Sequence, residues 1–221
     1  MIEKKEKLMN RFFSTVNFFS QRNEIILIVD DANLHSMMLI CQKGANTAIV
    51  TALSILARID AENKLAEAEE QLNVGIVLDQ TDVYFGICGD QERYVPVVLA
   101  PGFEEVLSNA EFLKNMGSRF LATETVYKSV DNMDSFANRY VGRLQTESLD
   151  IGLYDIYDNR TAEQRKLIKQ TQNVFEKAME LYEKGFYYEA KNMFAMVLRE
   201  NKQDMAAKYY IFRCEVLQDD N

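Results

Sequence analysis

The chain has 221 residues, 48% of them hydrophobic, which is enough apolar material for one domain of ordinary size and a small appendage. Its formal net charge of -9 at pH 7 would repel a phosphate backbone or an anionic lipid surface, so neither nucleic acid nor membrane is an expected partner. No run approaches the roughly 20 apolar residues that cross a bilayer, and the N-terminus lacks the pattern of a signal peptide.

Cysteine and histidine are too sparse for a structural metal site. The three cysteines, Cys41, Cys88 and Cys214, are far apart and each lies in an apolar run, so we expect free thiols in a reducing, cytoplasmic compartment. The single histidine, His35, has no Cys or His at zinc-ligand spacing and is interpreted as a structural residue. We therefore expect no cofactor.

The first predicted element is an amphipathic helix over residues 3–21, because its apolar residues recur at three-and-four spacing. One face of this helix is strongly aromatic, and it either belongs to the core or forms an exposed dimer surface. The candidate interface residues on it are Phe12, Phe13, Phe18 and Phe19.

A β-hairpin is predicted next, from two apolar runs on either side of the turn-forming sequence DDAN. Asp30 and Asp31 in this turn are weak candidates for a metal site, and adjacent carboxylates at such a position are more often simple turn formers.

The middle of the chain alternates between helical and strand patterns. A strong helix is predicted over residues 47–71, and a second helix over 103–115. Apolar runs separated by turn formers predict strands, and a short helix is expected over 124–130. The predicted strands are residues 73–79, 82–89, 93–100, 118–123, 139–145 and 151–158.

After Asp158 the sequence becomes almost entirely helical. Gly185, Ala190, Phe194 and Leu198 have the spacing of a tetratricopeptide hairpin, in which Gly185 ends the first helix and Ala190 allows close helix approach. We therefore divide the chain into an α/β domain, residues 1–158, and a helical tetratricopeptide-like extension, residues 159–221.

Three segments together resemble the class III adenylate and guanylate cyclases. They are GICGDQER, KNMGSRFLATETVY, and the strand pair YVGRLQ with LYDIYD, and the resemblance covers roughly Leu8 to Asp158. It implies an α/β (α+β) fold with a ferredoxin-like nucleotidyl cyclase sheet and flanking helices, starting after the family's first strand. The tail is similar to the helical extension of some bacterial members, and predicts a C-terminal helical hairpin.

The residues that the family uses for catalysis are replaced in this chain. The family reaction needs two metal ions held by two carboxylates. One carboxylate belongs to the family strand that precedes the resemblance, and the other aligns with Leu34 and His35, or with Asp30 or Asp31 if the hairpin is shifted. The purine-reading, ribose-orienting and phosphate-binding positions carry unsuited side chains. The degenerate equivalents are Val95, Pro101, Glu104, Ser108 and Glu147.

This pattern implies a catalytically inactive cyclase-like module that acts in dimerisation, regulation or scaffolding of a bacterial signalling protein. Its expected partner is a second copy of the chain or another cyclase-like protein. Two alternatives stay open: a divergent cyclase that is active only with a partner chain, and a non-catalytic nucleotide sensor. Val95 and Glu104 speak against the sensor, because neither suits a purine nucleotide.

Overall fold

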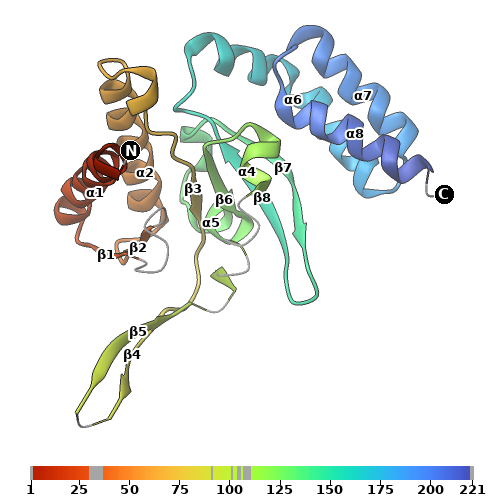
Figure 1. The fold of residues 1–221 in the computed structure, drawn as a ribbon. Helices are drawn as coiled ribbons and strands as arrows, with labels where there is room; N and C mark the ends of the chain where they lie inside the picture. The colour runs from red at the N-terminus through yellow and green to blue at the C-terminus, as the bar shows by residue number, and fades with distance from the viewer. Residues whose placement is uncertain are drawn as a thin grey trace. The chain divides into compact units, whose positions relative to one another are not determined.

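The computed structural model describes residues 2–29, 37–90, 92–100, 102–103, 106 and 111–219. The chain forms two compact units (Figure 1). The first comprises Met1–Ile76 and Ser129–Met133, and the second comprises Val77–Lys128 and Asp134–Asn221. The mixed α/β class is confirmed. The domain boundary placed after residue 158 stays a prediction.

The first unit contains a helix pair and a β-hairpin. Helix α1 (Ile2–Asn23) packs on α2 (Ala45–Asn63), and strands β1 (Ile25–Val29) and β2 (Met37–Cys41) pair antiparallel with Ile25 opposite Cys41. The predicted first helix and hairpin are therefore confirmed. The segment between the two strands, which carries Asp30, Asp31 and His35, lies outside the described residues.

The predicted helix over residues 47–71 was too long at its C-terminal end. Helix α2 ends at Asn63, and only a 3₁₀ turn, η1 (Ala68–Glu70), follows. The reason is the Asn63 side chain, whose Nδ2 donates to the Leu72 carbonyl at 2.8 Å while its Oδ1 accepts from the Leu72 amide at 2.9 Å. This pair of bonds holds the chain in a reversal that an uninterrupted helix could not make.

The aromatic face of α1 divides into two pairs. Phe12 and Phe19 pack against the core of the first unit, around the buried residue Val16 of the same helix. Phe13 is 41% exposed and Phe18 is 46% exposed. These four residues therefore do not form one uniform surface, and their role as a dimer interface stays a prediction.

Replacing Phe12 with alanine should lower the free energy of unfolding by about 2 kcal/mol, because it removes apolar contacts from a partly buried site. Phe13→Ala, the matched change on the exposed face, should cost less than about 0.5 kcal/mol. Urea unfolding followed by circular dichroism measures both. Equal losses in the two variants would contradict this division of the helix.

The second unit is built on a four-stranded sheet with the order β3-β6-β8-β7. Both β6 and β7 pair antiparallel with β8, which is mostly buried. Two short helices, α4 (Glu111–Met116) and α5 (Glu124–Ser129), flank β6 in sequence. The strand bounds are β3 (Ile76–Leu78), β6 (Phe120–Thr123), β7 (Asn138–Gln145) and β8 (Asp150–Ile156).

The C-terminal segment forms three helices, α6 (Ala162–Glu183), α7 (Tyr187–Glu200) and α8 (Met205–Asp219), so the predicted hairpin was one helix short. The third helix begins at Met205, and Oδ1 of the preceding Asp204 accepts a hydrogen bond from the Ala207 amide at 3.1 Å. Gly185 has φ +82° just after α6, as the helix-ending role requires.

The three C-terminal helices share one core with the sheet. Val141 and Leu153 from the strands lie in the same buried cluster as Phe175, Phe194 and Tyr210 from the helices. The helical segment therefore completes the burial of the sheet within the second unit. No helix in the described part of the chain is long and apolar enough to cross a membrane.

Candidate functional site

Most of the proposed catalytic equivalents cannot be placed. Asp30 and Asp31, the weak metal candidates, lie outside the described residues, and so do Pro101, Glu104 and Ser108. Within the residues that the structure describes, no cluster of three or more His, Cys, Asp or Glu side chains could hold a metal ion.

Val95 and Glu147, the two equivalents that are described, lie on separate elements. Val95 is on β5 (Tyr94–Leu99), opposite Cys88 of β4 (Tyr84–Gly89), and its side chain is 53% exposed. Glu147 is exposed in the turn between β7 and β8. Their correspondence to purine-reading and phosphate-binding positions stays a prediction.

Strands β4 and β5 form a two-stranded ribbon that pairs with no other described strand (Figure 1). We call residues Tyr84–Leu99 the arm. Its two strands carry no charged side chain and expose large apolar groups; every described residue of β4 is exposed. The large apolar side chains that are more than half exposed are Tyr84, Phe85, Ile87, Tyr94, Val95 and Leu99. An isolated two-stranded ribbon is only marginally stable, and exposed apolar patches of this kind mark interaction surfaces.

The tip of the arm is a tight turn organised by Asp90. Its Oδ1 accepts hydrogen bonds from the amides of Glu92 and Arg93, both at 2.9 Å, and these bonds lower the pKa of the Asp90 carboxyl. The Asp90 carboxylate therefore stabilises the turn itself, as is usual for an aspartate between two strands of a hairpin.

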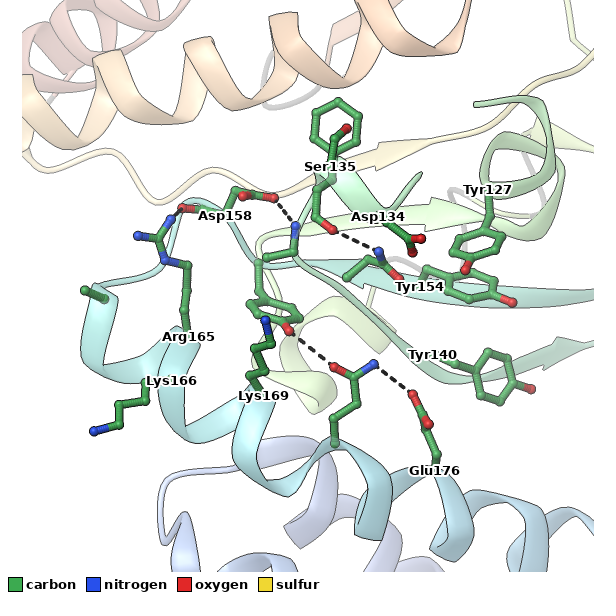
Figure 2. Close-up of a pocket in the computed structure, with 16 residues that line it drawn as sticks. Tyr127, Asp134, Ser135, Tyr140, Tyr154, Asp158, Arg165, Lys166, Lys169 and Glu176 are labelled. Carbon is green, nitrogen blue, oxygen red and sulfur yellow. Dashed lines mark hydrogen bonds between the residues drawn. The ribbon is translucent and has the colours of Figure 1, made fainter. Parts of the chain in front are cut away.

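A groove of about 810 Å³ lies in the second unit between α6 and the strands β7 and β8. Figure 2 shows Tyr127, Tyr140 and Tyr154 together on the strand side, and Arg165, Lys166 and Lys169 on α6. Its size is in the range of small-molecule sites. None of the sequence-predicted site residues lines it.

The tyrosines of the groove are held as a packed group. The rings of Tyr127 and Tyr154 stack with their centroids 4.0 Å apart, and Tyr140 meets Tyr154 edge-on at 5.4 Å. The Tyr140 hydroxyl donates a short hydrogen bond to Glu183. Burial, and next the Glu183 carboxylate, raise the pKa of Tyr140 far above its usual value, so the phenol stays protonated.

Sequence analysis missed this groove because its residues come from three separate segments. Tyr140 and Tyr154 were assigned only to strands, and the basic residues only to the helical extension. The available signal was one tyrosine on each of two predicted strands, Tyr140 and Tyr154, combined with three cations within five residues of one helix, Arg165, Lys166 and Lys169. Only the packing of α6 beside the sheet brings the two sets together.

Comparison with known proteins indicates an adenylyl cyclase-like fold. Two structures of a bacterial light-regulated adenylyl cyclase match with TM-scores of 0.62 and 0.61 and 18% sequence identity, over 78% and 77% of this chain. The terminal-differentiation-specific adenylate cyclase of Dictyostelium discoideum is 21% identical over 173 residues, 77% of this chain. No protein-family model matches.

The chain is short relative to these proteins. It spans 8% of the Dictyostelium protein and 52% and 50% of the two solved chains. At this level of identity the likeness establishes the fold, and the resemblance drawn from the three sequence segments agrees with it. Activity and partners of the whole relatives do not follow from it.

Proposed function

We propose that this chain is a catalytically inactive, adenylyl cyclase-like module that forms a homodimer through the arm and serves regulation or scaffolding in bacterial signalling. The observation that carries the proposal is the arm itself, whose two strands have no charged residue and expose large apolar side chains along their length. A second copy that covers these side chains removes their apolar surface from water. This burial stabilises the dimer by roughly 25 cal/mol per Å² of apolar surface.

Two features support the loss of catalysis. At the position that resembles the purine-reading aspartate, Val95 offers no hydrogen-bond acceptor. Glu147, at the position that resembles a phosphate-binding lysine, carries a charge that repels a triphosphate. Loss of one charge-stabilising group typically costs about 100 to 1000-fold in rate. Purified protein incubated with ATP or GTP and Mg²⁺ or Mn²⁺ should therefore produce no cyclic nucleotide, and sustained production would refute the inactive state.

Dimerisation should depend on the arm. Phe85 and Ile87 are two positions apart on β4, so their side chains share one face of the ribbon, and Ile87 is 73% exposed. The wild-type protein should sediment as a dimer at high micromolar concentration, and F85D/I87D should sediment as a monomer, because a charge buried at an apolar interface is strongly unfavourable. Analytical ultracentrifugation measures both.

The matched control is Phe212→Asp, which places the same charge on an exposed apolar position of α8 and should leave the dimer intact. A monomeric wild type, or a dimeric F85D/I87D, refutes the arm as the interface.

A further inference from the structure

The groove between α6 and the sheet is lined by no residue of the arm and by neither Val95 nor Glu147, the two described positions that resemble cyclase catalytic residues. Its lining residues all belong to the second unit, so its shape is set within one compact body. The groove, of about 810 Å³, combines an aromatic wall with a cluster of cations.

The strand side of the groove is suited to a flat ring. The stacked pair Tyr127 and Tyr154, with Tyr140 edge-on to it, forms an aromatic wall whose rings are fixed by their mutual packing. Fixed rings bind a planar group at low cost in conformational entropy. Asp134 also lines the groove, and its exposed carboxylate is an acceptor for an N–H group on such a ring.

The helix side of the groove is suited to an anion. Lys166 and Lys169 are three residues apart on α6, so they lie on the same face of the helix, and both line the groove. Among the described residues neither lysine has an ion-pair partner. Arg165 is anchored at the lip of the groove, where its Nη1 donates to the Asp158 carbonyl at 3.2 Å.

Two carboxylates that also line the groove are already engaged. Asp158 Oδ2 accepts the Ala137 amide at 2.7 Å, and Glu176 Oε1 accepts the Gln172 side-chain amide at 2.8 Å. These protein donors offset part of the negative charge near the lysines. The groove therefore has the Asp134 carboxylate and the aromatic wall toward one end. Toward the other end it has Lys166 and Lys169, whose ammonium groups are available to a ligand.

We propose that this groove binds a small organic anion that carries an amino-substituted aromatic ring. The ring packs against Tyr127 and Tyr154, its N–H group donates to Asp134, and the anionic group accepts hydrogen bonds from Lys166 and Lys169. A nucleoside monophosphate has this chemistry. Val95 and Glu147, the described positions that resemble the cyclase centre, do not line this site, and its occupancy is independent of dimerisation through the arm.

AMP is the probe for the full chain, with adenosine and inorganic phosphate as its two halves. Isothermal titration should show saturable AMP binding, with each half binding at least about tenfold more weakly, because each lacks one of the two sets of contacts. K166Q/K169Q should weaken AMP binding about tenfold or more, since two charge-assisted hydrogen bonds are lost. K177Q, an exposed lysine of α6 outside the groove, should bind AMP as the wild type does.

The aromatic wall is tested separately by Tyr127→Ala, which should weaken AMP binding several-fold, as the loss of one stacking partner does. Circular dichroism melting of each variant shows that the fold persists. Absence of AMP binding at millimolar concentration overturns the proposal, and so does unchanged binding to K166Q/K169Q. Phosphate that binds as tightly as AMP overturns the role of the ring. A monomeric chain that still binds AMP refutes only the arm interface.

Discussion

Replacing Arg139 with methionine is expected to destabilise the second unit by about 3–5 kcal/mol, one of the two largest effects of any single substitution proposed for this chain. Arg139 lies on β7, yet its side chain is only 1% exposed. Its Nη1 donates to Asp204 Oδ2 at 2.7 Å, and its guanidinium lies 4.1 Å from the centroid of the Phe175 ring. Methionine preserves much of the volume and removes the charge.

The loss of stability in this variant comes from Asp204, which loses its ion-pair partner. Asp204 is also buried, and its Oδ1 caps the first turn of α8 through the Ala207 amide. Without Arg139 this carboxylate must either stay charged without its partner or take up a proton, and both states are unfavourable at neutral pH. Asp155 is a second buried carboxylate. It pairs with Arg160 at 2.7 Å and accepts a hydrogen bond from Ser118 at 2.6 Å, so both interactions should persist in the variant.

The matched control is Arg143→Met on the same strand. Arg143 pairs with Asp150 at 2.7 Å, but both side chains are partly exposed, so the loss should be at most about 1 kcal/mol. In R139M/D204N the unpaired charge is gone, and the double variant should be more stable than R139M alone. Urea unfolding of the wild type, R139M, D204N and R139M/D204N gives the interaction energy of the pair, and R143M is unfolded beside them as the control. Equal losses in R139M and R143M would contradict a buried pair.

The order of elements was predictable from sequence because strands and helices follow local patterns. Segments such as 139–145 and 151–158 combine apolar side chains with turn formers at their ends, and both became strands. Gly185 marked the end of α6 because few other residues accept its backbone angle of φ +82°. The end of α2 was missed because the side-chain bonds of Asn63 to Leu72 leave no trace in the apolar periodicity.

The groove and the buried charges were not predictable because they depend on long-range contacts. Arg139 and Asp204 are 65 positions apart, and each alone reads as a solvated surface charge. The exposure of the arm also follows only from the structure, since the apolar pattern of β4 and β5 fits a core strand equally well. The resemblance to cyclases gave the fold; no local pattern pointed to the pairing of α6 with a tyrosine wall.

Gly142 lies on β7 where this strand packs against α8, at a position where no side chain fits. It follows an irregularity in the pairing of β7 with β8 between Tyr140 and Gly142, and its φ of +125° is one that other residues rarely adopt. The Tyr210 hydroxyl of α8 fills the space beside it and donates to the Val141 carbonyl at 2.6 Å. Burial raises the pKa of Tyr210 well above its usual value, so this donor keeps its proton.

Gly142→Ala is therefore expected to lower the free energy of unfolding by about 3–5 kcal/mol, because the added methyl group would overlap the Tyr210 hydroxyl while the backbone angle is strained. Urea unfolding measures the loss, and Gly86→Ala, with open space around the added methyl, should cost far less. Tyr210→Phe alone should lower the free energy of unfolding by about 1–2 kcal/mol, because a buried hydrogen bond is lost. The same change removes the hydroxyl oxygen that the added methyl group would overlap. G142A/Y210F should then be more stable than the sum of the single losses predicts, and simple additivity would show that the overlap with Tyr210 is not the cause.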